Sequence, residues 1–176
     1  MGALSAATRR LFFALWPDDA IRQALFHWQV HNLTSAVRWT HRTDLHMTLH
    51  FLGQVDVARI DGLLELGAGV ERSPIALVLD EIGYWPRPQV LWAGPSSMSG
   101  ELGALHARLG DGLRARGFST EVRDYRPHIT LARKVRERPD LRPLEPLSWL
   151  VSELALVESR AGTAPMYRPI ARWPLG

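Results

Sequence analysis

The sequence predicts an α+β fold of two pseudo-symmetric lobes, each an antiparallel sheet with helices on its outer face, that together form a central cleft. Apolar residues fill 11–16 as in a buried strand, whereas leucines recur at helical spacing within 100–116. The predicted symmetry comes from a repeated pattern. His-x-Thr-Leu occurs at 46–49 and again at 128–131, and the midpoint of the two histidines, residue 87, nearly bisects the 176-residue chain.

The first half of the chain should contribute two strands, two helices and one short strand. We expect a strand at 11–16, a helix from about 17 to 32, a short strand at 37–39, a strand at 45–52 and a helix from about 55 to 70. Asp18 and Asp19 favour the start of the first helix, because acidic side chains are stabilised at a helix N-terminus. Gly53 is expected to end the strand that carries the first motif.

A hairpin across the midpoint of the chain follows, and the second half then repeats this scheme. We expect strands at 75–79 and 89–92 around a proline-bearing turn at 83–88, a helix at 100–116, a second motif strand entered through Arg126 and Pro127, a strand at 150–157 and a last edge strand at 167–170. Leucines 102, 105, 109 and 113 form the core-facing side of the helix, and Gly117 caps its end. We therefore expect one domain, 1–176, with lobes of about 1–86 and 87–176.

The repeated pattern places two kinds of side chain on one face of a strand. Because side chains alternate along a strand, His46 and Thr48 should share one face, and so should His128 and Thr130. Each strand then presents an imidazole beside a hydroxyl, which is half of a phosphate site. With 7 His, 8 Thr and 26 Leu in the chain, roughly 0.05 matches to the pattern are expected by chance, and two are present.

Several segments together resemble one known family. They are Arg-Leu-Phe-Phe-Ala at 10–14, Leu-His-Met-Thr-Leu at 45–49, Phe-Leu-Gly at 51–53 and Arg-Pro-His-Ile-Thr-Leu-Ala-Arg at 126–133. The chain is similar over nearly its whole length, from about Arg9 to Trp173, to the two-histidine phosphoesterase superfamily. Within that superfamily it resembles the RNA 2′,3′-cyclic phosphodiesterases, which are also called 2′-5′ RNA ligases.

Two facing histidines are suited to acid–base chemistry on a phosphate, because imidazole titrates near neutral pH. The hydroxyls of Thr48 and Thr130 are placed to donate to phosphate oxygens. The resemblance implies that His46 is the proton donor and His128 the proton acceptor, that the 3′ oxygen leaves, and that the product is a 2′-phosphomonoester. It also implies 2′-5′ ligation as a secondary reverse reaction, and neither a metal nor a cofactor is expected.

Arg133 is a further candidate that strict alternation does not support. Alternation points its side chain away from Thr130, yet the family it resembles uses an arginine here against the phosphate. A β-bulge would reconcile the two expectations. His50 shares the parity of His46, but Ala132 stands at the matching place in the second motif, so we expect His50 to be structural.

Other aromatic and imidazole side chains have alternative interpretations. Phe12 or Phe13 can stack on an RNA base or pack in the core, and the sequence does not decide between these roles. His27 and His31 are spaced like metal ligands on a helix, but no third ligand is visible, so surface or packing roles are expected. His41 begins a further His-x-Thr that lacks the strand pattern.

The amino-acid composition limits the kinds of protein that this chain can be. Apolar residues make up 46% of the chain, which is enough for one core, and the absence of cysteine excludes disulfides and thiolate nucleophiles. The net charge is +3, and 20 of the 21 basic residues are arginine, which suits phosphate binding but also follows from genomic base composition. We expect a cytoplasmic monomer without membrane contact, whose partner is RNA with a 2′,3′-cyclic phosphate end, tRNA fragments among them.

Two alternative functions remain open at this stage. A related esterase acting on small cyclic phosphates or on 2′-5′ oligonucleotides would carry the same motifs, since it presents the same phosphate to them. A non-catalytic protein that binds RNA ends would also need a phosphate cleft, although it needs only hydrogen-bond donors and not two intact imidazoles.

Overall fold

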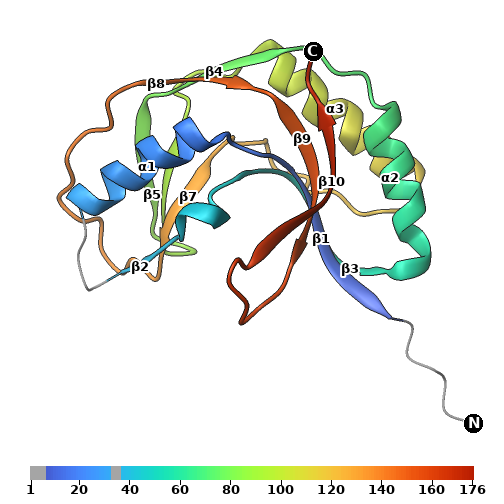
Figure 1. Cartoon of the computed structure of the whole chain (residues 1–176), viewed down its shortest axis with the longest axis horizontal. Coiled ribbons are helices and arrows are strands. Elements are labelled where there is room, and N and C mark those ends of the chain that lie inside the picture. Colours follow the sequence, from blue (N-terminus) through green and yellow to red (C-terminus); the bar gives the residue numbers. More distant parts are fainter. Residues whose placement is uncertain (1–6, 33–36) are drawn as a thin grey trace, which may run out of the picture.

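The computed structural model describes residues 7–32 and 37–176, which form a strongly curved antiparallel sheet with helices packed against it (Figure 1). In the described residues the strand order is β10-β9-β1-β3-β7-β6-β5, with β2 pairing β7 at the side, and β4 pairs β8 in a separate ladder. The strands are β1 (Thr8–Leu15), β2 (Arg38–Trp39), β3 (Met47–Asp56), β4 (Ile75–Leu79), β5 (Glu81–Trp85), β6 (Val90–Gly94), β7 (Ile129–Arg133), β8 (Leu147–Val151), β9 (Glu153–Ser159) and β10 (Tyr167–Pro174).

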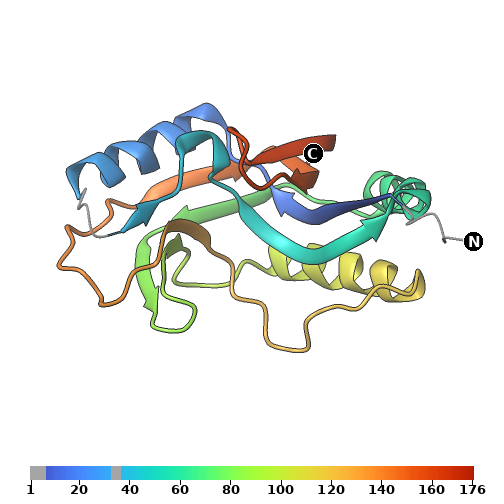
Figure 2. The ribbon, with the colours of Figure 1, turned by 90° about the horizontal axis from the view of Figure 1, so that it is seen from below.

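The helices are α1 (Asp19–His31), α2 (Ile60–Gly69) and α3 (Gly100–Ala115), with short 3₁₀ turns η1 (Arg42–Asp44) and η2 (Val57–Arg59). Asp18 caps α1 by accepting from the backbone N–H of Ile21, and Ser99 caps α3 in the same way through Leu102. Helices α2 and α3 pack on the part of the sheet that contains β3, β9 and β10. Helix α1 lies over the other part, beside β2 and β8 (Figures 1 and 2).

Strand β1 is buried on both faces, as its apolar run predicts. Leu11, Phe13 and Leu15 point into the main core, while Phe12 and Trp16 belong to a smaller apolar cluster on the opposite face. The strand is paired on one side with β3 and on the other with β9. This second cluster is important for function, because it forms the floor beneath the first motif.

The two parts of the sheet meet at one narrow joint. Strands β3 and β7 pair through Met47 and Ile129 alone. Each of these residues follows a motif histidine directly, so both motifs lie at the centre of the molecule. The approximate symmetry axis that the repeated sequence pattern predicts therefore passes through this joint.

The structure corrects three expectations about the strands. Gly53 does not end β3; it lies inside the strand at a β-bulge with φ of +70°, and β3 continues to Asp56. The strand expected at 89–92 pairs with β5, which contains Gly83, Tyr84 and Trp85, rather than with 75–79. The segment 150–157 belongs to two strands, β8 and β9, that run in different ladders.

The division of the chain into lobes near residue 86 also needs correction. Strands β9 and β10 come from the C-terminal end, yet they pair beside β1, and β4 from the first half pairs with β8 from the second. The chain therefore interleaves, and neither half of the sequence supplies a whole half of the sheet. Strand pairing over such sequence distances leaves no local signal for a boundary.

Candidate active site

The pairing at the joint of β3 and β7 places the four motif side chains around one point. Met47 pairs with Ile129 in an antiparallel ladder. The neighbouring residues therefore pair as well, with His46 opposite Thr130 and Thr48 opposite His128. Each imidazole is thus beside a hydroxyl of its own strand and a hydroxyl of the facing strand. The structure brings together the four residues that the sequence pattern singles out.

Both imidazoles are oriented by the same backbone contact. His46 Nδ1 lies 2.7 Å from the carbonyl oxygen of Asp44, and His128 Nδ1 lies 2.8 Å from the carbonyl oxygen of Arg126. A carbonyl only accepts, so Nδ1 carries the proton in each ring. The second nitrogen, Nε2, is consequently the atom that each histidine offers for proton transfer.

The two Nε2 atoms differ in their surroundings. His46 Nε2 lies 3.1 Å from the Thr48 hydroxyl, which donates to it when the ring is neutral. Within the described residues, His128 Nε2 has no hydrogen-bond partner. The free nitrogen of His128 is therefore the one open to a water molecule.

Aromatic rings surround each histidine. Phe12 and Tyr167 lie with ring centroids 4.8 and 4.7 Å from the His46 ring, and Trp16 stacks on it at 6.0 Å. The His128 ring has Trp85 edge-on at 4.6 Å. These walls limit the directions from which water or a ligand can approach the imidazoles.

Burial has a direct electrostatic effect on both histidines. It lowers the pKa of His46 to about 4, because a charged imidazole is poorly solvated among aromatic rings, and the cations Arg133 and Arg22 act in the same direction. Burial also lowers the pKa of His128, again with a contribution from Arg133. Without a bound anion, both imidazoles are therefore neutral at pH 7.

Asp44 links the first motif to the β9–β10 turn. The buried carboxylate of Asp44 accepts from the backbone N–H groups of Met166 and Tyr167 at 3.0 and 3.1 Å, which fixes the ring of Tyr167 against His46. The same residue orients His46 through its backbone carbonyl. One short segment thus positions both the imidazole and part of its aromatic wall.

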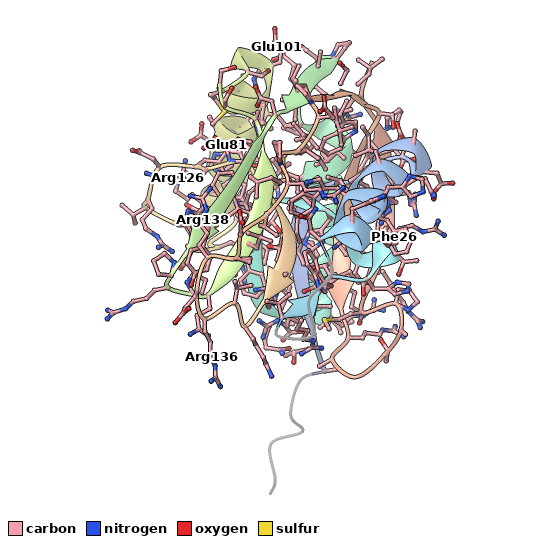
Figure 3. All side chains as sticks on the ribbon, turned by 90° about the vertical axis from the view of Figure 1, so that its left-hand side faces the viewer. Phe26, Glu81, Glu101, Arg126, Arg136 and Arg138 are labelled. Carbon is pink, nitrogen blue, oxygen red and sulfur yellow. The ribbon has the colours of Figure 1, made fainter. Side chains whose placement is uncertain are left out.

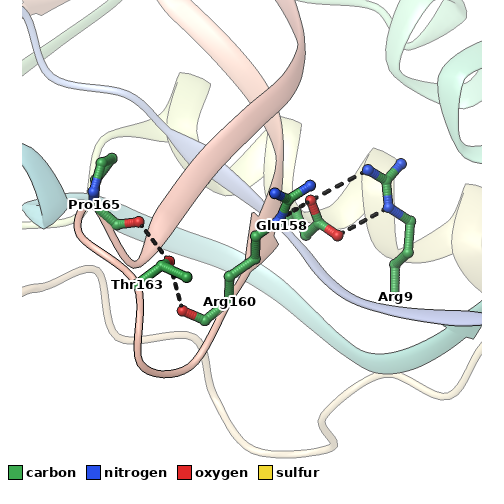
Figure 4. A network of polar contacts seen from close by, with 5 residues as sticks. All are labelled: Arg9, Glu158, Arg160, Thr163 and Pro165. Atoms are coloured by element: carbon green, nitrogen blue, oxygen red, sulfur yellow. Dashed lines mark hydrogen bonds and ion pairs between the residues drawn. The ribbon is translucent and has the colours of Figure 1, made fainter.

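The β9–β10 turn is itself held by a polar network (Figure 4). Glu158 accepts two hydrogen bonds from Arg9 of β1 and one from Arg160, and these ion pairs lower the pKa of Glu158 although burial opposes the shift. The Thr163 hydroxyl bridges backbone carbonyls of Arg160 and Pro165 across the turn. The turn is therefore a rigid support for the site.

A β-bulge in β7 explains the position of Arg133. Opposite β6, the register skips Leu131, so Leu131 and Ala132 both point inward and are fully buried. Arg133 then returns to the face of Thr130, is exposed, and influences the pKa of both histidines. The bulge that reconciles alternation with an arginine at the phosphate is present.

Strand β3 carries a bulge at the equivalent place. The register against β1 skips Leu49, and the parity of His50 changes as a result. His50 is buried, its Nε2 lies 2.8 Å from the backbone carbonyl of His106, and the two rings stack at 4.1 Å. The structural role expected for His50 agrees with this packing.

A cavity of about 800 Å³ opens beside the motif residues. It lies between β3, the β5–β6 turn and the loop from α3 to β7. Figure 2 shows this turn and this loop on one side of the sheet. His128 and Thr48 line this cavity, and Trp85, Arg87 and Arg126 are among its other lining residues. Its volume is within the range of small-molecule sites.

Sequence reasoning missed several residues of this site. Trp85 and Arg87 were assigned only to a turn, and Tyr125, whose hydroxyl donates to the Thr48 carbonyl at 2.9 Å, was not singled out. The position of Tyr125 directly before the Arg-Pro-His segment was the one local signal available. Asp44 gave no signal, because the partners of its carboxylate are more than 120 residues away.

The remaining candidates have packing or surface roles. Phe13 is fully buried and Phe12 is 2% exposed, so both pack, and neither presents a face to an RNA base. His27 and His31 are exposed and make local contacts on α1, and no group of three or more metal-ligating side chains occurs in residues 7–32 and 37–176. His41 caps η1 through its ring nitrogen.

Known proteins match this chain over most of its length. Residues 17–163 match the model of the 2′-5′ RNA ligase superfamily. The RNA 2′,3′-cyclic phosphodiesterase of Escherichia coli K12 is 32% identical over 170 residues, covering 95% of this chain and 97% of its own, and that of Thermus thermophilus is 31% identical, covering 94% and 90%.

Solved structures agree with the sequence relatives. E. coli LigT complexed with 3′-AMP superposes with a TM-score of 0.87 at 30% identity, covering 96% of this chain and 99% of its own. A crystal structure from Thermus thermophilus gives a TM-score of 0.80 at 27% identity, covering 94% and 97%. No helix in the part of the chain that the structure describes is both long and apolar enough to span a bilayer. The chain belongs to the 2′-5′ RNA ligase superfamily, as its match to the family model shows and as its fold and site geometry support.

Proposed function

We propose that this protein is an RNA 2′,3′-cyclic phosphodiesterase that opens cyclic ends to 2′-phosphomonoesters. The observation that carries the proposal is the joint of β3 and β7, which sets two imidazoles and two threonine hydroxyls around one point. A phosphate there has a proton acceptor on one side, a proton donor on the other, and hydroxyl donors for its non-bridging oxygens.

In the proposed reaction, His128 Nε2 removes a proton from a water molecule as the water oxygen attacks phosphorus. The bond from phosphorus to the 3′ oxygen breaks in line with the attack, and His46 Nε2 gives its proton to that oxygen. Thr48, Thr130 and Arg133 stabilise the charge on the non-bridging oxygens. The same step with a 5′-hydroxyl RNA end in place of water, in which the 5′ oxygen attacks phosphorus and the 3′ oxygen leaves, gives 2′-5′ ligation as a secondary reaction.

The bound phosphate supplies the proton donor that the free protein lacks. His46 is neutral at pH 7 in the free protein, because burial lowers its pKa to about 4. An anion between the two imidazoles raises both pKa values, since it stabilises their charged forms. When His46 becomes protonated, Thr48 no longer donates to its Nε2, and the hydroxyl is released to donate to the phosphate.

The terminal nucleoside is proposed to occupy the cavity beside His128. Thr48 and His128 line the cavity, which is large enough for a nucleoside, and the half-buried ring of Trp85 forms part of its wall. An aromatic wall of this kind offers a stacking surface to any base. Within the same proposal, the protein acts in the cytoplasm as a monomeric single domain, with tRNA fragments among its RNA ends.

Product analysis tests the reaction. An oligonucleotide with a 2′,3′-cyclic phosphate end should yield only the 2′-phosphomonoester, and chelator should not change the rate. A 3′-phosphate product would show that the other oxygen leaves, which contradicts the assigned geometry. Tight binding of the cyclic end without any product would instead identify a non-catalytic RNA-end binder.

A substitution of Trp85 tests the nucleoside site. Trp85→Ala should lower kcat/KM on a nucleoside 2′,3′-cyclic phosphate by roughly 5- to 150-fold, since stacking of one base contributes about 1–3 kcal/mol. The control is Trp149→Ala, of which only the folding is measured. Trp149 is buried in the core and does not line the cavity, so this variant shows what the loss of a core tryptophan does to the fold. A folded Trp85→Ala protein with unchanged kcat/KM would place the base elsewhere.

A further inference from the structure

A short segment directly after the second motif carries the excess positive charge of the chain. We define the cationic segment as residues 133–138, Arg-Lys-Val-Arg-Glu-Arg. Four of the 21 basic residues and one of the 18 acidic residues fall within it, which leaves 17 of each elsewhere. The net charge of +3 is therefore concentrated in six residues that begin at the site.

The backbone of the cationic segment is fixed to the β5–β6 hairpin. Val135 is fully buried, and its N–H donates to the carbonyl of Gln89 in the hairpin turn at 3.0 Å. The Tyr84 hydroxyl lies 2.8 and 2.9 Å from the carbonyls of Val135 and Arg136. The charged side chains are therefore presented from a preorganised backbone, which reduces the entropy lost on binding.

All four cations of the segment are exposed, and among the described residues none of them has a carboxylate within ion-pair distance. Some arginines elsewhere on the surface, Arg108 and Arg172 among them, do pair with acidic residues. Figure 3 shows Arg126, Arg136 and Arg138 on the same side of the molecule. A row of unpaired cations on one side is a surface suited to a linear polyanion.

The row is continuous with the proposed nucleoside cavity. Arg133 starts the segment at the two histidines, and the hairpin turn to which the segment is bonded also contributes Arg87 to the cavity. A strand that leaves the cavity across this turn meets the cationic segment next. The segment is thus placed to contact the nucleotides that neighbour the bound end.

We propose that the cationic segment binds the phosphodiester backbone of the RNA nucleotides that precede the cyclic end. Arginine forks match phosphate oxygens with two parallel hydrogen bonds, and contacts of this kind are independent of base sequence. The inference rests on the proposed function, since it assigns a path to the same substrate. It predicts that the protein distinguishes an RNA strand from a mononucleotide by charge.

The test compares two substrates with one terminal nucleoside: a nucleoside 2′,3′-cyclic phosphate and a ten-nucleotide RNA with the same cyclic end. The variant is Arg136→Ala with Arg138→Ala, and the matched control is Arg108→Ala with Arg116→Ala on exposed positions of α3 and its C-terminus. The first pair should lower kcat/KM on the ten-mer by roughly tenfold and leave the mononucleotide unchanged. The control pair should change neither.

Salt dependence gives a second readout. Loss of two phosphate contacts should reduce the slope of log affinity against log salt for the ten-mer by roughly 1.4. Equal effects on both substrates, or no effect on the ten-mer, would overturn the inference. A ten-residue glutamate peptide that protected Lys134 from amine-reactive labelling as well as the ten-mer does would also overturn the inference. The surface would then recognise acidic protein as well as RNA.

The single lysine of the chain allows a footprint that does not depend on turnover. Lys134 lies within the cationic segment, and amine-reactive labelling of it can be read on one peptide. The ten-mer should protect Lys134 in a His46→Ala, His128→Ala protein, and the mononucleotide should not. If the ten-mer binds to the wild-type protein and protects Lys134 but is not hydrolysed, the proposed function fails while this inference stands. Unprotected Lys134 in a saturated complex contradicts the inference alone.

Discussion

Individual side chains in the site are aimed by backbone contacts close to them in the sequence. Each histidine donates from Nδ1 to the carbonyl two residues before it, so the imidazole orientation is encoded within three residues. This locality is the reason that the pattern His-x-Thr-Leu identified the site without any knowledge of the fold. The aromatic walls from Trp85 and Tyr167 belong to distant segments, and no short pattern encodes them.

Substitution of the two histidines should separate their roles. On a cyclic-phosphate RNA, His46→Ala and His128→Ala should each lower kcat by about two to four orders of magnitude, because one removes the acid and the other the base. On bis(p-nitrophenyl) phosphate, whose leaving group needs no proton, His46→Ala should lose little activity and His128→Ala should still lose much. The reverse pattern would exchange the roles, and full turnover of the cyclic substrate by either variant would exclude the mechanism.

The pH dependence should reflect the low pKa values of the free protein. Because His46 must be protonated and both pKa values lie below the usual value of imidazole, log kcat/KM should fall by about one unit per pH unit above about pH 6.5. Arg133→Gln should move this break to higher pH, since Arg133 lowers both pKa values, and should also reduce the maximum. Arg38→Gln, at the paired position in β2, is the control. A rate that rises through pH 8 would contradict the assignment.

Strands and loops account for the features that strict periodicity misplaces. A bulge follows the threonine in both motif strands, at Leu49 and at Leu131, and each reverses the alternation that the sequence predicts. Gln29 of α1 donates to the Leu131 carbonyl at 3.0 Å, so a distant helix helps to hold the second bulge. Bulges depend on such partners, which explains why the sequence placed His46 and Thr48 correctly but left Arg133 undecided.

The loop before β7 should position His128 through Tyr125. The Tyr125 hydroxyl donates to the Thr48 carbonyl, and the next residue, Arg126, orients His128. Tyr125→Phe should lower kcat by roughly tenfold with little change in KM, because small displacements of a catalytic group are costly. The pH at which kcat/KM breaks should not move, and the free energy of unfolding should fall by only about 1 kcal/mol.

Tyr84→Phe is the matched control for Tyr125→Phe, since the Tyr84 hydroxyl also donates to backbone carbonyls but in the cationic segment and not in a strand that carries a motif histidine. Its kcat on a nucleoside cyclic phosphate should equal that of the wild type. An NMR signal from the His128 ring should shift in Tyr125→Phe and not in Tyr84→Phe. Equal kcat values for the two variants would show that Tyr125 has only a structural role.

At the scale of the whole molecule, repetition in the sequence predicted the symmetry but not the topology. The two motifs meet at the joint of Met47 and Ile129, because the approximate axis passes between the two strands. The lobe boundary was wrong for the sheet, since β9 and β10 return to pair beside β1. Helices such as α1 and α3 lay where their apolar spacing predicts, because that signal is local.

This interleaving predicts that neither half of the chain folds alone. Residues 1–86 lack β9 and β7, so both edges of the β1–β3 pair lose their neighbours. Residues 87–176 lack β4, the partner of β8, and they lack β1 and β3, which pair with β9 and β7. Leu11, Phe13 and Leu15, all fully buried in the intact protein, would then be exposed to water in the first fragment. Each fragment alone should give poorly dispersed NMR spectra and no cooperative unfolding. An equimolar mixture of the two should recover dispersion and cyclic phosphodiesterase activity, because only together do they complete the sheet and bring His46 to His128. Native-like dispersion in either fragment alone would contradict the single-domain organisation and restore a boundary near residue 86.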